Sequence, residues 1–215
     1  MSGARAEILG RIKRALPDIP GDETAADVPV QRAYRRTGSP SADDLVTRFA
    51  DRVSEYKARV RVVAAGELPA AIAAACARRG VRRLVVPPDL PPHWAPDGVE
   101  LLRDEGLSNT ALDESDGVLT GCALGIAQTG TLVLDGGAHQ GRRAISLLPD
   151  YHLCVVDAAQ IVDLVPEAVE RLYPAAREAR RPVTFISGPS ATSDIELNRV
   201  EGVHGPRTLE VLIVE

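Results

Sequence analysis

The chain is poor in cysteine, and its few cysteines are far apart. Of 215 residues only three are cysteines, Cys76, Cys122 and Cys154, and no two of them form a Cys-x-x-Cys pair. The usual ligand spacings therefore exclude a zinc knuckle and a self-contained iron–sulfur cluster in this chain. We expect each cysteine to be a small buried apolar residue. Cys122 stands apart because it lies in a glycine-rich segment.

Long apolar runs are missing as well. The longest apolar segments, such as residues 68–77, fall far short of the roughly 20 residues that a transmembrane helix needs. The N-terminus has no apolar signal core, because charged residues punctuate it. These residues are Arg5, Glu7, Arg11, Lys13 and Arg14. We therefore expect a cytoplasmic protein without a membrane span.

An excess of positive charge is also lacking. Lysine and arginine number 25 against 30 aspartates and glutamates, which gives a formal net charge of −5. Such a composition offers no basic field for nucleic acid. What the chain does have is length and apolar content. Its 215 residues, 45% of them hydrophobic, suffice for one large domain, with or without a small appendage.

Helical periodicity at the start of the chain gives way to an irregular stretch. Apolar residues recur at helical spacing over residues 4–16, which predicts a short amphipathic helix. Residues 17–40 lose this periodicity and gather proline, glycine, aspartate and threonine. Ser41, followed by two aspartates, is typical of a helix N-cap. We therefore divide the chain into an N-terminal helix and arm, 1–40, and an α/β domain, 41–215.

Strand-like and helix-like segments alternate in the rest of the chain. A strand over 60–64, a helix over 68–79 and a strand over 82–86 form the βαβ pattern of parallel strands. Shorter helices are predicted over 142–148 and from 166 to 171 or a little beyond. The pattern predicts an α/β fold with three layers around a parallel or mixed sheet, and ligand-binding turns where strands end. Further strands are predicted at 99–102, 117–120, 131–134, 153–156, 183–186 and 209–214.

Two turns in the middle of the chain combine glycine with threonine. Thr120 and Gly121 end one apolar segment, and Thr129, Gly130 and Thr131 lead into another. Glycine lets a ligand approach the main chain, and threonine adds a hydroxyl. These turns suit a carboxylate or phosphate, although their side chains cannot move protons at neutral pH. The alternative is a plain β-turn.

Amide and guanidinium side chains lie close to these turns in the sequence. Gln128 directly precedes the Thr-Gly-Thr turn, where its amide can orient a polar ligand but cannot act as a base. Arg142 and Arg143 follow a glycine-rich loop, and a guanidinium fork suits a carboxylate or phosphate. Each arginine could equally lie on a solvated helix face. We select Arg143 as a candidate ligand-binding residue.

A second turn of the same kind lies near the end of the chain. Ser187, Gly188 and Ser190 follow a predicted strand and precede hydroxyl and acidic residues, which is typical of a helix N-terminus. Free amides and the helix dipole favour an anion there. Asp194 and Glu196 are candidates for acid–base groups, or they cap and complement the turn.

His204 lies between two turn glycines and is, by residue type, the strongest candidate for a general acid or base. The alternative is a structural histidine. Together with Asp194 or Glu196 it lacks the close ligand spacing of a metal site, so we predict no metal.

Six segments together resemble the LUD-domain family, and their order along the chain makes the resemblance specific. They are RAEIL (5–9), GVLTGC (117–122), IAQTGTLVL (126–134), RAISLLPDYH (143–152), ISGPSATSDIE (186–196) and GVHGP (202–206). The resemblance implies a fold like that of NagB, ribose-phosphate isomerase and the CoA transferases. One position departs from the family, where Ala-Glu-Thr-Gly-Thr is frequent: here Gln128 replaces the glutamate. Chemistry that depends on that carboxylate would be lost.

The resemblance further implies a part in the oxidation of L-lactate to pyruvate, beside partner subunits that carry iron–sulfur clusters. The chain has neither a cluster-binding cysteine set nor a Gly-x-Gly-x-x-Gly between a strand and a helix, so we expect no cofactor in it and no electron transfer by it alone. It would be an accessory or substrate-binding subunit of a lactate dehydrogenase or oxidase complex. Two other functions stay open: an independent enzyme for a sugar-phosphate or CoA-like anion, and a regulatory or assembly module that senses a carboxylate.

Overall fold

The computed structural model describes residues 2–17, 24, 27, 30–38, 40–189 and 205–215. The chain forms two compact units, Met1–Arg35 and Arg36–Glu215, each described by itself. The first contains helix α1 (Ser2–Ala15), which confirms the predicted N-terminal helix. Its apolar residues Ile8, Leu9 and Ile12 are exposed. Among the described residues, no helix has the length and apolar character needed to cross a bilayer.

Helix α2 (Ala42–Glu55) begins at the N-cap that the sequence predicts. The Ser41 hydroxyl accepts a hydrogen bond from the Asp44 N–H (3.2 Å), and the Asp44 carboxylate accepts the Ser41 N–H in return. This reciprocal capping box satisfies two amides that the helix itself cannot pair. Val46, Phe49 and Val53 form the buried stripe of the helix.

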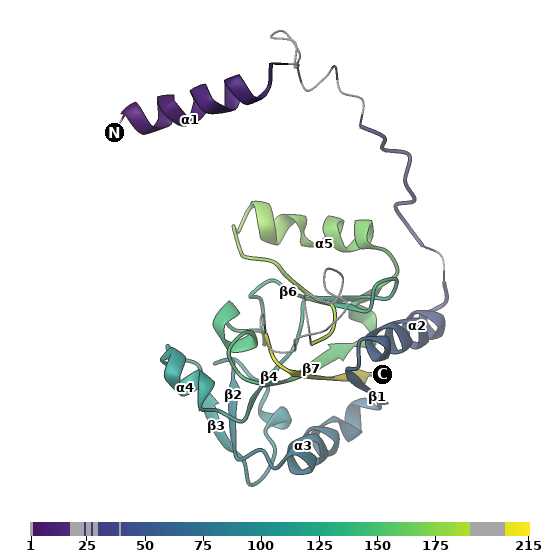
Figure 1. The fold of residues 1–215 in the computed structure, drawn as a ribbon. Helices are drawn as coiled ribbons and strands as arrows, with labels where there is room; N and C mark the ends of the chain where they lie inside the picture. Colours follow the sequence, from purple (N-terminus) through teal and green to yellow (C-terminus); the bar gives the residue numbers. More distant parts are fainter. Residues whose placement is uncertain (1, 18–23, 25–26, 28–29, 39, 190–204) are drawn as a thin grey trace. The chain divides into compact units, whose positions relative to one another are not determined.

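Six parallel strands form the main sheet, in the order β1-β10-β7-β4-β2-β3 (Figure 1). Helix α3 (Leu68–Arg79) connects β1 to β2 and ends at Gly80, whose φ of +67° favours glycine. The predicted βαβ unit is therefore confirmed. The strands are β1 (Arg59–Val63), β2 (Arg83–Val86), β3 (Glu100–Arg103), β4 (Gly117–Thr120), β7 (Tyr151–Asp157) and β10 (Thr208–Val214).

A second, smaller sheet has the order β8-β5-β6-β9 and mixes parallel with antiparallel pairs. Two of its strands, β5 and β8, have no counterpart among the predicted elements. The Thr129–Thr131 turn belongs to the antiparallel β5–β6 hairpin of this sheet. The turn thus lies where a strand ends, as predicted, and this strand is part of an antiparallel pair. The strands are β5 (Leu124–Ile126), β6 (Thr131–Leu134), β8 (Ile161–Val162) and β9 (Thr184–Ile186).

The shorter helical segments differ from prediction in two places. The segment predicted as a helix over 142–148 is the 3₁₀ turn η3 (Arg143–Ser146), which Gly141 at φ +66° precedes and Pro149 follows closely. Helix α5 (Val165–Arg177) extends further than the predicted range of 166 to 171 or a little beyond. The other short segments are η1 (Ala65–Glu67), η2 (Pro92–Trp94), α4 (Asn109–Asp113) and η4 (Ala158–Gln160).

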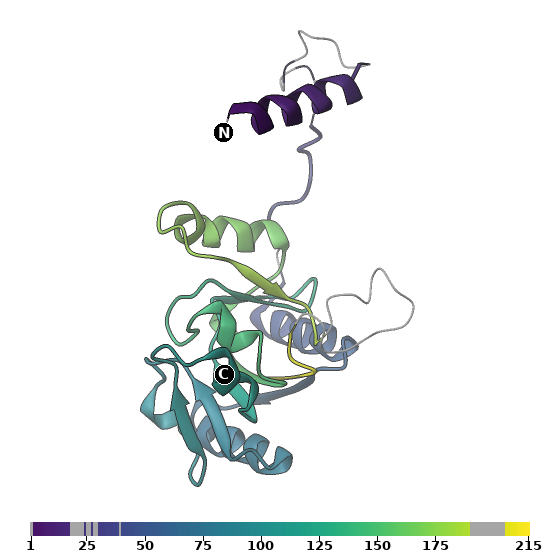
Figure 2. The ribbon, with the colours of Figure 1, turned by 60° about the vertical axis from the view of Figure 1, so that its left-hand side comes forward.

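The two faces of the main sheet are covered by different elements. Helix α3 covers one face, where Ile72 packs in a core with strand residues such as Leu212. Helix α2 and the second sheet cover the other face, where Phe49 packs in a core with Leu132 and Val211. Helix α5 covers the outer face of the second sheet (Figures 1 and 2). Strands β5, β6 and β8 are thus buried on both faces, whereas Phe185 on the edge strand β9 is 50% exposed.

Candidate functional site

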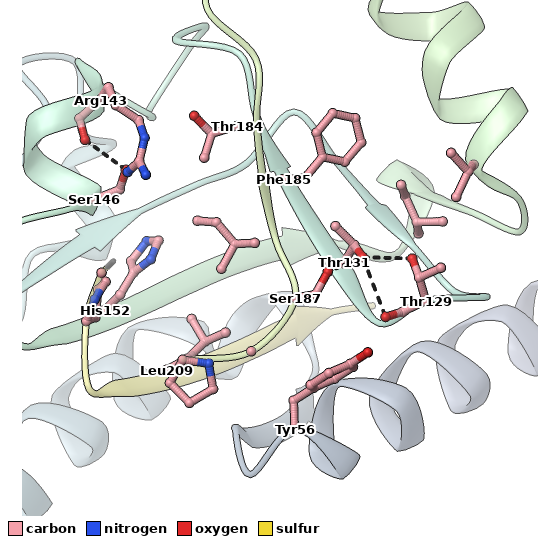
Figure 3. Close-up of a pocket in the computed structure, with 17 residues that line it drawn as sticks. Tyr56, Thr129, Thr131, Arg143, Ser146, His152, Thr184, Phe185, Ser187 and Leu209 are labelled. Atoms are coloured by element: carbon pink, nitrogen blue, oxygen red, sulfur yellow. Dashed lines mark hydrogen bonds between the residues drawn. The ribbon is translucent and has the colours of Figure 1, made fainter. Parts of the chain in front are cut away.

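A cavity of about 530 Å³ is lined by residues of both sheets (Figure 3). Three sequence-predicted groups meet around it: the Thr129–Thr131 turn, Arg143 and the Ser187–Gly188 turn. The cavity lies near the amino ends of β7 and β10, because His152 and Leu209 at the beginning of these strands line it. The other lining residues are Tyr56, Ile126, Ser146, Val165, Thr184, Phe185, Ile186, Pro189, Gly205 and Pro206.

Three hydroxyl groups form a row on one wall of the cavity. Thr131 Oγ1 lies 2.7 Å from Thr129 Oγ1 and 2.7 Å from Ser187 Oγ. Three hydroxyls carry three hydrogens and their two mutual bonds use two, so one hydrogen remains for a ligand or for the Thr129 carbonyl, 3.5 Å from Thr131 Oγ1. The row joins the two turns that lie far apart in the sequence, and it can donate to an anion.

The two neighbouring arginines differ in their partners. Arg142 makes two hydrogen bonds to the Asp104 carboxylate, at 2.7 and 3.0 Å, and a third to the Leu107 carbonyl. Arg143 is exposed and reaches only Ser146 Oγ among the described residues, at 3.3 Å. Arg142 is therefore a structural residue, whereas the guanidinium of Arg143 is free to bind an anion in the cavity (Figure 3).

A buried histidine, His152, adds a group that sequence reasoning did not select. Its side chain is fully buried, and its Nε2 lies 2.7 Å from Thr120 Oγ1. Its Nδ1 is buried and has no hydrogen-bond partner among the described residues, although the ring lines the cavity. A buried unpaired ring nitrogen costs free energy unless a ligand satisfies it. The sequence feature that could have indicated it is a histidine directly before the apolar run 153–156.

Thr120 lies behind the cavity rather than on its wall. It is fully buried, and its hydroxyl connects His152 to Cys154 Sγ, which lies 4.0 Å away. Hydrogen bonds from Cys122, His152 and Thr120 lower the pKa of the Cys154 thiol, against the effect of its burial. The same bond to Cys154, together with burial, raises the pKa of Cys122. All three cysteines are free and buried, as predicted.

Both turn glycines pack against the C-terminal end of α2. Gly130 has φ +59°, and a Cβ atom there would lie 2.6 Å from the carbonyl carbon of Arg52. Gly188 has φ +78°, and a Cβ atom there would collide with Tyr56. Close packing against α2 and a positive φ therefore explain why glycine occupies both positions, without reference to a ligand. The groups next to these glycines that can contact a ligand are the hydroxyls of Thr129, Thr131 and Ser187.

The remaining predicted residues lie elsewhere. Gln128 is exposed, its backbone N–H donates to the Asp163 carbonyl, and it is not among the described lining residues. Gly121 lines a different cavity. Four other candidates, Ser190, Asp194, Glu196 and His204, lie outside the described residues. The chain enters and leaves that segment at Pro189 and Gly205, which both line the cavity.

Comparison with known proteins identifies relatives along the whole chain. A model of the LUD domain matches residues 100–214. A lactate utilization protein C from Deinococcus radiodurans is 48% identical over 212 residues, which span 98% of this chain and 95% of that protein. A protein of the same name from Bacillus velezensis is 25% identical over 97% of this chain and 92% of its own length.

A solved structure shares the fold. The crystal structure of a DUF162 family protein from Deinococcus radiodurans superposes with a TM-score of 0.72 at 45% sequence identity. It covers 82% of this chain and 100% of that chain.

Proposed function

Because this chain belongs to the LUD-domain family, we propose that it acts in lactate utilization as a subunit that binds a small 2-hydroxy or 2-oxo carboxylate, lactate or pyruvate. Partner subunits that carry iron–sulfur clusters would accept the electrons, since this chain has no cysteine set for a cluster. The main sheet of six parallel strands with helices on it also supports the NagB-like, three-layer relationship that the sequence resemblance implies.

One observation carries this proposal: the cavity combines a hydroxyl row with an arginine and a buried histidine nitrogen that have, among the described residues, no acidic partner and no hydrogen-bond partner respectively. The Arg143 guanidinium matches a carboxylate, because its N–H groups form a planar fork. The hydroxyls of Thr129 and Thr131 can bond the second polar end of the ligand. A volume of about 530 Å³ admits a three-carbon acid with room to spare.

His152 is suited to take the proton of the 2-hydroxyl group. When the single hydroxyl hydrogen of Thr120 points to Cys154 Sγ, Thr120 Oγ1 accepts the Nε2–H of His152. The lone pair of a neutral ring then lies on Nδ1, the nitrogen for which the described part of the chain offers no hydrogen-bond partner. In the oxidation of lactate, the hydroxyl proton passes to Nδ1, and the C2 proton and two electrons leave to acceptors on the partner subunits.

The predicted acid–base residues Asp194, Glu196 and His204 stay part of this proposal, because the segment that contains them starts and ends at the cavity. Gln128 has no assigned contact with the ligand, since its side chain is exposed. A phosphate-bearing substrate is the competing function, because the same hydroxyls and Arg143 also suit a phosphate. The ligand titration below separates these two functions.

Calorimetric titration of lactate, pyruvate, phosphate and CoA into the full chain tests the proposal. We expect lactate or pyruvate to bind, and Arg143→Ala to weaken that binding about tenfold to a hundredfold, since a hydrogen bond to a charged group is worth roughly 1.5–3 kcal/mol. Thr129→Ala removes a neutral hydrogen bond and should cost less, about 1 kcal/mol.

The matched control is Arg61→Ala, which removes the same charge from an exposed position on β1. It should bind like the wild type. Binding of phosphate or CoA alone would favour the competing enzyme. If no anion binds, or if Arg143→Ala binds each anion as the wild type does, the carboxylate site is wrong and the turns are purely architectural.

A further inference from the structure

A second cavity, of about 830 Å³, lies at the opposite edge of the main sheet. Gly121 follows β4, Asp157 ends β7 and Val214 ends β10, and all three line it. Ligands of open parallel sheets bind outside the carboxyl ends of the strands, which is this edge. The two cavities have no described lining residue in common. We propose that this cavity is a separate binding site for a planar nitrogen heterocycle that carries an N–H donor, such as a nucleobase.

Aromatic rings form one wall of this cavity. The ring of Trp94 lies 5.8 Å from that of His139, centroid to centroid, at 59°. His93 meets Trp94 edge-on, with centroids 6.3 Å apart. Gly121 lies next to this wall, since a Cβ atom there would lie 3.4 Å from the Cβ of His139 and 3.6 Å from Cη2 of Trp94. With no side chain at Gly121, this edge of the tryptophan ring is left uncovered by a Cβ atom.

His139 is held in one orientation, with one ring nitrogen fixed as a donor. Its backbone has φ +61°, which is uncommon outside glycine, and its N–H donates to the Asp89 carboxylate at 2.8 Å. Its Nδ1 lies 2.7 Å from the main-chain carbonyl of Asp89, and its own carbonyl accepts the Gly121 N–H at 2.7 Å. A carbonyl only accepts, so Nδ1 carries the hydrogen and Nε2 of the neutral ring is an acceptor.

Several of the charged groups around the cavity have partners within the protein. Arg181 pairs with Asp135 at 2.9 Å, and Asp135 also accepts bonds from the Gln140 side chain and the Gly137 N–H. The Asp157 carboxylate caps the Ala159 N–H. Arg181 Nε, however, is buried without a hydrogen-bond partner among the described residues, and Arg171 also lines the cavity, so the site offers N–H donors beside the acceptor on His139. The acceptor on His139 selects a ligand with an N–H group, and the Trp94 ring selects a flat one.

Trp94 is the only tryptophan of the chain, so its fluorescence reports on this cavity alone. We expect adenosine, guanosine or nicotinamide to change Trp94 fluorescence saturably in the full chain. Among adenine ligands, N6,N6-dimethyladenosine keeps the ring but has no N–H donor on the base, and it should bind at least about tenfold more weakly than adenosine. Lactate should leave the fluorescence unchanged.

Variants separate this site from the carboxylate site. His139→Asn removes the ring acceptor and keeps a residue that tolerates positive φ, and it should weaken adenosine binding about tenfold. Thr129→Ala and Arg143→Ala, which alter the first cavity, should bind adenosine like the wild type. The proposal is wrong if no heterocycle gives a saturable signal at millimolar concentration, or if both adenosine ligands bind equally. Loss of lactate binding in Arg143→Ala would not contradict this proposal, because Arg143 does not line the second cavity.

Discussion

At the scale of single residues, neighbouring side chains of the same type have different tasks. Arg142 and Arg143 are adjacent, yet the first pairs with Asp104, a carboxylate only 6% exposed, and the second lines a cavity. Nothing in the local sequence separates them, because the partner of Arg142 comes from a position 38 residues earlier. Which arginine is free to bind a ligand is therefore decided by tertiary structure.

Replacing Arg142 by alanine should lower the free energy of unfolding by about 1–3 kcal/mol at neutral pH, because it leaves the Asp104 carboxylate buried without its cation. Burial acts to raise the pKa of Asp104, but the hydrogen bonds and charge of Arg142 outweigh it and hold the pKa below its usual value. The pair therefore stabilises the fold above about pH 4 and loses this effect as the pH falls through the lowered pKa.

Urea denaturation of the wild type and Arg142→Ala at pH 7 and near pH 3 measures this difference. The gap between the two proteins should narrow at the lower pH. Arg61→Ala serves as the control, since it removes an exposed arginine and should unfold like the wild type. A gap of the same size at both pH values would contradict the assignment of the effect to Asp104.

At the scale of elements, the end of helix α2 supports two turns at once. Gly130 of the β5–β6 hairpin contacts Arg52 and Val53, and Gly188 after β9 contacts Tyr56. The helix thereby fixes both turns whose hydroxyls meet in the first cavity. A change in how α2 packs would alter the hydroxyl row without touching any of its members.

Gly130→Ala tests this support. A methyl group there meets the backbone of α2, with the Arg52 carbonyl carbon 2.6 Å away, and the φ of +59° adds strain. We expect a loss of about 2–4 kcal/mol in unfolding free energy. Gly98→Ala is the matched control, because Gly98 has φ +74° with nothing within 4 Å of the added Cβ, and it should lose only about 1–2 kcal/mol. Equal thermal shifts in the two variants would show that packing on α2 contributes nothing.

At the scale of the whole molecule, the boundary between the two compact units can be tested by truncation. The second unit begins at Arg36, whereas the sequence predicts the domain from residue 41. Gly38 belongs to the second unit, where its N–H donates to the Glu167 carboxylate at 2.9 Å. It also packs so closely on Asp163 that no side chain would fit there.

Deleting residues 2–35 should therefore leave the thermal unfolding of the second unit unchanged. Deleting residues 2–40 also removes Gly38 and its bond to Glu167, which should cost about 0.5–1.5 kcal/mol. Differential scanning calorimetry of the two truncated proteins distinguishes these outcomes. If the shorter deletion already abolishes the cooperative transition, the N-terminal helix is part of the core.

Sequence periodicity predicted the elements that carry enough residues to show it. Helix α3 and strands β4 and β6 have the predicted bounds. Strands β6 and β9 of the second sheet were predicted, but β5 and β8 were not, because they have only three and two residues. The same holds for the first cavity. Turn chemistry predicted Thr129, Thr131 and Ser187 as lining residues. The environment of His152 could not be predicted, because it is set by a hydrogen bond to Thr120, 32 positions away.

Strand β10 pairs with β1 on one side and β7 on the other, although it follows both in the chain. β1 and β7 are therefore synthesised before the strand that pairs with both of them. The main sheet cannot close until residues 208–214 have been synthesised, so its formation waits on a late event. Until then the pairing edges of β1 and β7 lack their partner strand. Unpaired edges with apolar side chains make a chain prone to aggregation and dependent on chaperones.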